Sequence, residues 1–330
     1  MSARLSLPRR LLRTQHLPTR PFIRTLQTSP TTPANPLPIT AHGPAPGPPI
    51  PEHSPIADLR ARQKKAHADP KSRFWKTVNV TSTPEGYNIQ LDNRLVKTPV
   101  KKPLTIPASK PFLANAIALE WSHLRTNKDA HKTHLVPLTQ LASRAIDIRD
   151  DEREGIVQNL IRYLDTDTVL CWAPTIPEAE RDPARKSLRE LQIEEAMPIM
   201  GWLTARVWRG LTIHPQDGDE GGLYGKPQDA ATRETLLQWM RELGSFELVG
   251  FERIVLAAKS FLIGARMVEE WREGGERKWG VEEAARAASV EVDFQTRTWG
   301  EVDDTHDVEK QNIKRQIGAG WLLVYTQAEK

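Results

Sequence analysis

The sequence has one cysteine, Cys171, among its 330 residues, and it has no long apolar run. A single cysteine forms no disulfide within the chain and leaves too few thiolates for a zinc site built on cysteine. The apolar residues beside Cys171 predict a buried, unreactive thiol. Because no stretch approaches the roughly 20 apolar residues that a bilayer requires, we expect no membrane insertion.

Acidic residues and lysine are absent from the first 33 residues, which contain six arginines together with serine and threonine. This composition is typical of a mitochondrial transit peptide. We therefore assign residues 1–33 as a transit peptide and expect the protein in the mitochondrial matrix. The alternative interpretation is a disordered basic tail. Residues 24–29 look like the two-step processing pattern of matrix precursors, which places the mature N-terminus near Ala34.

The formal net charge of +4 comes from this leader. The whole chain has 46 basic and 42 acidic residues, so setting aside the six leader arginines leaves 40 basic residues against the same 42 acids. The rest of the chain is therefore slightly acidic. Its charge balance gives no support for a nucleic-acid partner.

Prolines crowd residues 30–55, where bulky apolar residues are few, so we interpret residues 34–72 as a disordered linker. From residue 74 to 107, aromatic and β-branched stretches alternate with turn residues, which predicts a small antiparallel sheet. Helical periodicity follows, with Ser109 as the expected N-cap of the first helix. Further helices are expected over residues 138–148, 152–164, 183–207, 232–243, 246–271, 281–298 and 308–325.

This order of elements predicts an α+β protein, in which a small antiparallel β-rich N-terminal part is followed by a larger α-helical part. We place a β-rich domain with helices at residues 73–176 and an α-helical domain at residues 177–330.

Standard catalytic signatures are missing. The Gly225-Lys226 pair superficially resembles a phosphate loop, but Pro227 replaces the hydroxyl residue and Glu220 stands in place of the first glycine. Neither a dinucleotide fingerprint nor a nucleophile elbow is present. We expect no cofactor and no catalytic residue.

Two acidic stretches are open to a metal-site interpretation, residues 165–167 and residues 303–307. In the first, Asp and Thr side chains can equally bond nearby backbone donors where the chain turns. The second lies where a helix is expected to begin, so capping and the helix dipole account for its acids. We therefore predict no metal site.

Seven segments together resemble the mitochondrial F1-ATPase assembly chaperone family, whose members bind the alpha subunit of ATP synthase. The segments are residues 73–75 (Arg-Phe-Trp), 91–94 (Leu-Asp-Asn-Arg), 118–121 (Ala-Leu-Glu-Trp), 163–168 (Tyr-Leu-Asp-Thr-Asp-Thr), 250–252 (Gly-Phe-Glu), 256–260 (Leu-Ala-Ala-Lys-Ser) and 291–300. Each is weak alone, but their order and spacing over residues 72–326 make the combination specific. One departure is Ala196, where the family pattern leads us to expect tryptophan.

The resemblance implies an assembly chaperone, not an enzyme, that binds the unassembled F1 alpha subunit in the matrix and promotes assembly of the F1 sector. It implies no cofactor and no nucleic acid, and we expect a monomer. The alternative function is a matrix enzyme with a carboxylate-lined site, using acids such as Asp165, Asp167, Glu252 and Glu291.

Five residues are the candidates for client binding: Glu291, Phe294, Gln295, Trp299 and Glu252. The resemblance carries over Glu291, which begins a Glu-x-x-aromatic-Gln pattern. On one ideal helix, Glu291 shares a face with Ala284, Ala287, Ala288, Phe294 and Gln295. An acid on such a face is either exposed for recognition or locally paired. The same choice applies to Glu252, which Arg253 or Arg266 is positioned to neutralise.

The leader yields the first prediction. We expect the imported protein to begin near Ala34, because the acid-free segment is removed during import. N-terminal sequencing of protein purified from mitochondria checks this, and an intact Met1 would contradict the assignment.

Overall fold

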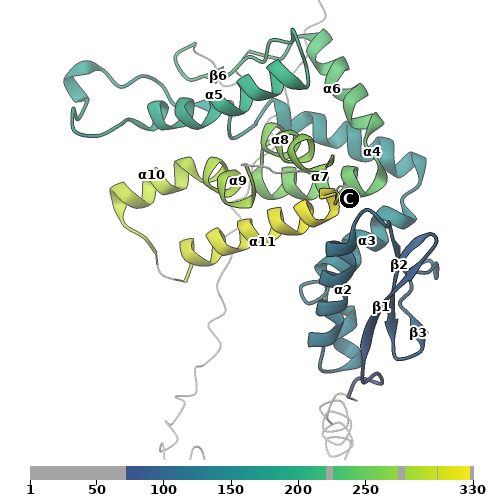
Figure 1. Cartoon of the computed structure of the whole chain (residues 1–330). Helices are drawn as coiled ribbons and strands as arrows, with labels where there is room; N and C mark the ends of the chain where they lie inside the picture. Colours follow the sequence, from purple (N-terminus) through teal and green to yellow (C-terminus); the bar gives the residue numbers. More distant parts are fainter. Residues whose placement is uncertain (1–71, 221–225, 274–278, 303, 328–330) are drawn as a thin grey trace, which may run out of the picture. The chain divides into compact units, whose positions relative to one another are not determined.

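The computed structural model describes residues 72–220, 226–273, 279–302 and 304–327. The assigned transit peptide and the linker up to residue 71 lie outside these ranges. In the described part, a small antiparallel sheet precedes a series of helices, which confirms the predicted α+β class (Figure 1). None of the helices in this part combines the length and the apolar character needed to cross a membrane.

The four-stranded sheet is built around one central strand. Its strands are β1 (Val78–Thr83), β2 (Gly86–Leu91), β3 (Arg94–Leu95) and β4 (Thr105–Ile106). Strand β2 pairs antiparallel with each of the other three. The turn between β1 and β2 requires Gly86, whose φ is 139° and where a Cβ atom would lie 2.1 Å from the Ile106 carbonyl oxygen. No residue with a side chain fits between these backbones.

The remaining elements are mostly helical. The α-helices are α2 (Pro111–His123), α3 (Pro137–Asp147), α4 (Asp150–Leu160), α5 (Leu188–Arg206), α6 (Ala230–Glu242), α7 (Ser245–Ala258), α8 (Phe261–Trp271), α9 (Val281–Ala288), α10 (Val290–Trp299) and α11 (His306–Val324). Short connections form η1 (Asn127–His131), η2 (Ile161–Leu164), η3 (Glu178–Glu180) and the parallel pair β5 (Cys171–Trp172) and β6 (Gln216–Asp217).

The single helix expected over residues 246–271 was wrong, because the chain breaks between α7 and α8. Lys259 has a φ of 52°, in the left-handed region, and ends α7. Ser260 then caps α8, since its hydroxyl accepts a hydrogen bond from the Ile263 N–H at 3.0 Å. An apolar pattern continues through this break, so periodicity alone does not reveal it.

Three other helix predictions also needed correction. The helix expected over residues 281–298 is two helices, α9 and α10, joined at Ser289. The helix expected from residue 183 begins only at Leu188, because Ser187 and Glu190 form a capping box. The first helix begins at Pro111 with Lys110 as its N-cap, so Ser109 does not cap it. Proline is favoured in the first turn because its missing N–H needs no partner there.

Buried apolar side chains form two cores. The sheet core is made by Trp75, Ile89, Leu91, Val96, Leu104, Ile106, Leu113, Ala114, Ile117, Leu124, Val136, Leu138, Ala142, Ala145, Val249, Ala319 and Leu323. The second, the helical core, takes residues from α4 to α9 and from α11, including Phe251, Ile254, Ile317 and Val324. Helices α7 and α11 therefore contribute to both cores, and all described residues fall in one compact unit.

The contact between α7 and α11 is the most extensive between any two elements of the described part. It brings Gly250 and Gly320 together. A Cβ atom on Gly250 would lie 2.7 Å from the Gly320 carbonyl oxygen, and one on Gly320 would lie 2.7 Å from the Gly250 carbonyl oxygen. The two helix backbones therefore touch at this crossing, at a separation that only glycine allows.

This crossing yields the second prediction. We expect Gly250→Ala and Gly320→Ala each to lower the melting temperature by several degrees. Overpacking costs about 1–3 kcal/mol or more, and it outweighs the ~1 kcal/mol that alanine contributes through helix propensity. In a chain of this size, 1 kcal/mol corresponds to roughly 2–4 °C.

The matched controls for this test are Gly155→Ala and Gly201→Ala, because a Cβ atom at these helical positions meets nothing within 4 Å. We expect both controls to leave the melting temperature unchanged or to raise it. A pattern in which all four variants melt alike would show that the crossing is not closely packed.

Candidate functional site

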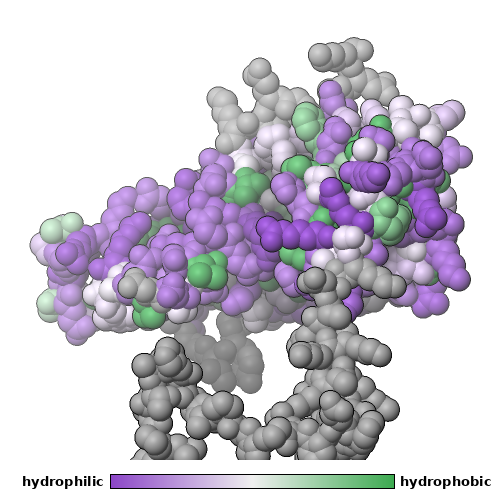
Figure 2. Space-filling view, turned by 90° about the horizontal axis from the view of Figure 1, so that it is seen from below, coloured by the Kyte–Doolittle hydropathy of each residue, from purple (hydrophilic) through white to green (hydrophobic). Residues whose placement is uncertain are grey.

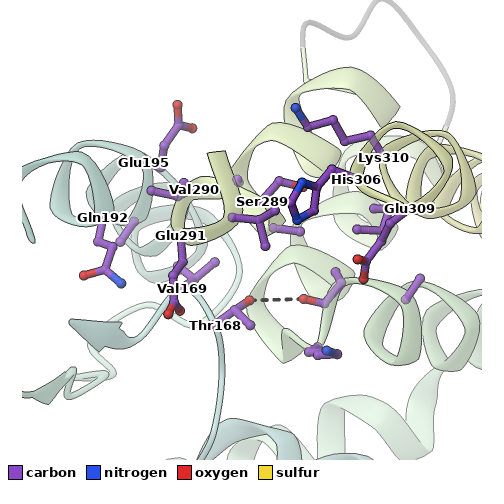
Figure 3. A pocket seen from close by; sticks show the side chains of 18 residues that line it. Thr168, Val169, Gln192, Glu195, Ser289, Val290, Glu291, His306, Glu309 and Lys310 are labelled. Carbon is purple, nitrogen blue, oxygen red and sulfur yellow. Dashed lines mark hydrogen bonds between the residues drawn. The ribbon is translucent and has the colours of Figure 1, made fainter. Parts of the chain in front are cut away.

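A pocket of about 170 Å³ lies where α5, α9, α10 and α11 meet the C-terminal end of α7 (Figure 3). Its volume is comparable with that of an apolar cavity of about 150 Å³ that binds benzene. Alanines make up much of the lining: Ala196, Ala257, Ala258, Ala287 and Ala288. Small side chains from three helices leave a space here that larger residues would fill.

Glu291 lines this pocket from the first turn of α10. Its side chain is exposed, and it accepts a hydrogen bond from Gln295 Nε2 at 3.0 Å. No basic group of the described part forms an ion pair with it. Among the described residues, Glu291 thus has a neighbour that orients its carboxylate but none that forms an ion pair with it.

The predicted helical face around Glu291 was wrong in part. The prediction of that face assumed one helix through residues 284–295, but the chain forms two helices, α9 and α10, which meet at Ser289, where φ is −111° and ψ is 8°. Ala287, Ala288 and Glu291 nevertheless meet in the pocket, whereas Phe294 does not line it. Tertiary packing adds Ala196, Ala257 and Ala258 from α5 and α7, which the periodicity of residues 284–295 did not indicate.

A second unpaired acid, Glu309 of α11, lies across the pocket from Glu291 (Figure 3). It is exposed and makes no ion pair with any described residue. The side chains of Glu195 and Lys310 extend away from the pocket in Figure 3. Glu195 pairs with Arg286 at 2.9 Å, and Lys310 pairs with Asp293 at 3.2 Å.

One lysine also lines the pocket without an ion-pair partner among the described residues, Lys259 at the left-handed position after α7. The uncompensated charges of the lining are therefore two carboxylates and one ammonium group. His306 lies between Glu291 and Glu309 in Figure 3, and its Nδ1 accepts the Val302 N–H at 2.9 Å. The arrangement suits a cationic head group whose aliphatic stem lies along the alanines.

Two further predicted residues lie on other surfaces of α10. Phe294 lines a separate groove with Ile176 and Leu191. Trp299, the last residue of α10, has 76% of its surface exposed. A large aromatic side chain in water is unfavourable for the isolated protein and is common at contact surfaces.

Glu252 is not brought to this pocket. It lies on α7, and its carboxylate forms an ion pair with Arg144 of α3 at 3.0 Å. The expected neutralising partners were therefore wrong, since Arg266 pairs instead with Glu270 at 3.0 Å. Burial raises the pKa of Glu252, and the charge of Arg144 counteracts that shift. This ion pair connects α3 to α7.

The two acidic stretches have other partners. Asp167 is fully buried, and its two carboxylate oxygens accept the N–H groups of Val169 and Leu262, each at 2.9 Å. Asp165 pairs with Arg233 at 2.7 Å. In the second stretch Asp303 lies outside the described residues. Across the described ranges, no group of three or more His, Cys, Asp or Glu side chains is placed to hold a metal ion.

Cys171 is exposed, so the prediction of a buried thiol was wrong. It lies in the two-residue strand β5, which pairs with β6 at the surface and not within a core. Its pKa is nevertheless raised, first by partial desolvation and then by the charges of Asp167 and Glu291. The thiol is therefore protonated at neutral pH.

The sequence did not indicate that Glu309 and Lys259 line the same pocket as Glu291. Lys259 lies within one of the seven segments of the family resemblance. The apolar periodicity around it predicts only that it belongs to a helix, not that it lines a pocket. Glu309 is one of several acids near the start of α11, where capping and dipole stabilisation explain such residues. Only the packing of α11 against α9 identifies it.

Comparison with known proteins identifies the family of the chain. The family described as ATP12 chaperone protein matches residues 72–204. The mitochondrial protein atp12 of Schizosaccharomyces pombe is 32% identical over 254 residues, and the match covers 76% of this chain and 81% of that protein. The chain belongs to the ATP12 chaperone family.

Two further comparisons agree with this membership. The mitochondrial ATP12 of Saccharomyces cerevisiae is 31% identical to this chain, with 77% of this chain and 84% of that protein covered. The crystal structure of ATP12 from Paracoccus denitrificans has a TM-score of 0.60 at 23% identity, covering 77% of this chain and 98% of that one. The structural comparison shows that this chain and the Paracoccus denitrificans protein share a fold.

The contrast between Glu252 and Trp299 yields the third prediction. We expect Glu252→Gln to lower the free energy of unfolding by about 1 kcal/mol, because Arg144 loses its partner but remains half exposed to water. Trp299→Ala is expected to change it by ~0.5 kcal/mol or less, since the indole packs against little. Urea unfolding measures both. A larger loss for Trp299→Ala than for Glu252→Gln would reverse these assignments.

Proposed function

We propose that this ATP12 family protein is an assembly chaperone of the mitochondrial matrix, which binds the unassembled F1 alpha subunit and promotes assembly of the F1 sector of ATP synthase. Family membership supports the chaperone role, and the mitochondrial relatives and the acid-free leader support the location. In this proposal the protein acts by binding, without a cofactor or a chemical step, and it acts as a monomer.

The observation that carries the proposal is the pair of unpaired carboxylates, Glu291 and Glu309, across a pocket lined with alanine. Uncompensated charge at a small-residue pocket has little value for stability, but it is what a binding site for a basic side chain requires. A lysine or arginine of the client would place its aliphatic stem along the alanines and its head group between the two carboxylates.

Exposed apolar side chains at the end of α10, at the start of α11 and between the two helices add to this surface. Trp299, Val302 and Val308 are 76%, 57% and 57% exposed. On the face that Figure 2 presents, hydrophobic residues are scattered among hydrophilic ones and do not form one broad patch. Recognition on such a surface depends on individual apolar contacts combined with charge, which suits a client that must later be released.

Masking is the physical basis of the chaperone action. A subunit interface that awaits its partner exposes apolar and charged surface that is prone to aggregation. Binding of that surface by the chaperone lowers the concentration of the exposed form. When the true partner subunit offers a larger complementary interface, it displaces the chaperone by mass action.

The fourth prediction tests Glu291. We expect Glu291→Lys to weaken retention of the alpha subunit by about tenfold or more, because a like charge would then face the basic group of the client. The melting temperature should stay within a few degrees of normal, since Glu291 is exposed and unpaired. Pulldown of purified alpha subunit and thermal melting measure the two properties. Glu291→Gln, which only removes the charge, should give an intermediate loss.

The matched control is Glu242→Lys. Glu242 is also exposed on a helix, where it accepts a hydrogen bond from the glutamine four residues away, Gln238, at 2.9 Å. Glu283, an acid close to Glu291 in the sequence, is unsuitable as a control, because its carboxylate accepts the Gly280 N–H and caps α9. Equal retention by the Glu291 and Glu242 variants would remove Glu291 from the binding site, and a collapsed melting temperature for Glu291→Lys would make it a structural residue.

A further inference from the structure

A second cavity, of about 380 Å³, lies between the start of α3, α7, α9 and the C-terminal half of α11. We call it the arginine groove, after Arg253 and Arg315, which both line it. The rest of its lining is mostly apolar and includes Leu138, Trp321 and Leu322. None of the residues that line the Glu291 pocket lines this groove.

The two arginines of the groove have no carboxylate within ion-pair distance in the described part of the chain. Arg315 donates to Asn312 Oδ1 at 3.0 Å, which is a neutral partner. Arg253 has a buried Nε with no hydrogen-bond acceptor. Burial lowers the pKa of Arg253 and the nearby charge of Arg315 lowers it further, whereas the charge of Glu252 acts in the opposite direction. Two like charges close together repel each other more strongly where burial weakens their solvation, and a carboxylate from a ligand would reduce that repulsion.

The acids nearest to the groove are already committed. Glu120 lines it, but one carboxylate oxygen accepts the Leu138 N–H at 2.7 Å and the other accepts the N–H and hydroxyl of Thr139. Glu252 is paired with Arg144. The described chain therefore offers no free carboxylate for an ion pair with Arg253 or Arg315, so a carboxylate that pairs with them would come from another molecule.

Gly318 lines the groove and has free space beside it. A Cβ atom on Gly318 would meet nothing within 4 Å, so the glycine leaves space above the helix. Trp321 Nε1, from the same helix, is a second buried donor without an acceptor. An apolar lining of this size beside two guanidinium groups suits an apolar side chain next to a carboxylate.

We propose that the arginine groove binds an acidic segment of a polypeptide, with a Glu or Asp carboxylate at Arg253 and Arg315 and a neighbouring apolar side chain in the space above Gly318. A small inorganic anion would use the guanidinium groups but leave the apolar lining uncovered. That lining makes a polypeptide the occupant. The inference rests on the proposed function in one respect, that the polypeptide is the client of the chaperone.

The test uses the full chain and a fluorescent hexapeptide of alternating glutamate and leucine. We expect saturable binding by anisotropy, and a loss of about tenfold or more in affinity for both Arg315→Glu and Gly318→Leu. The first variant repels the carboxylate and the second fills the apolar space. The matched controls are Arg209→Glu, at an exposed arginine outside the groove, and Gly201→Leu, at another helical glycine with open space around its Cβ position.

Further measurements distinguish a polypeptide site from a small-anion site. A hexapeptide of glutamate and serine should bind weakly. Equal binding of this peptide, together with displacement by inorganic phosphate, would overturn the inference in favour of a small-anion site. Groove and control variants that bind the glutamate–leucine peptide alike would also overturn it. Glu291→Lys should leave peptide binding intact, so a failure of the groove and a failure of the Glu291 proposal give different results.

Discussion

The close crossing of α7 and α11 is the constraint on which the rest of the structure depends. Gly250 and Gly320 place each backbone against the carbonyl oxygen of the other, so the two helices meet without intervening side chains. Neighbouring residues of the same two helices then fall on both sides of the crossing, where Val249 and Leu323 enter the sheet core and Ile254 enters the helical core. One contact thereby joins two cores into a single packed unit.

Both candidate sites are built on this helix pair. The end of α7 and the start of α11 line the Glu291 pocket, whereas Arg253 and the C-terminal half of α11 line the arginine groove. The separation between the sites is therefore set by the helices, not by loops. The sites carry opposite charge, with carboxylates uncompensated in one and guanidinium groups in the other. A surface of this kind favours a partner whose basic and acidic groups match in both sign and position.

Other acids of the described chain have partners that Glu291 and Glu309 do not have. Asp167 and Glu120 resemble site residues by type, but their carboxylates accept backbone N–H groups and hold helix ends in place. Glu252 joins two helices through Arg144. These three acids therefore have partners within the described part of the chain. Glu291 and Glu309 differ because no described residue forms an ion pair with either of them, which leaves their charge available to another molecule.

The sequence by itself determined the α+β order, the turns of the sheet, most helix positions and the resemblance that gave the family, because these depend on local pattern and turn chemistry. It also pointed to Glu291. Tertiary structure decided what local pattern does not encode. The helix breaks at Lys259 and Ser289 interrupt continuous apolar periodicity, and Glu309, Arg253 and Arg315 acquire meaning only through their neighbours. Whether a charged side chain is paired depends on residues far away in the chain, so only the packed fold distinguishes Glu252, which pairs with Arg144, from Glu291, which forms no ion pair with a described residue.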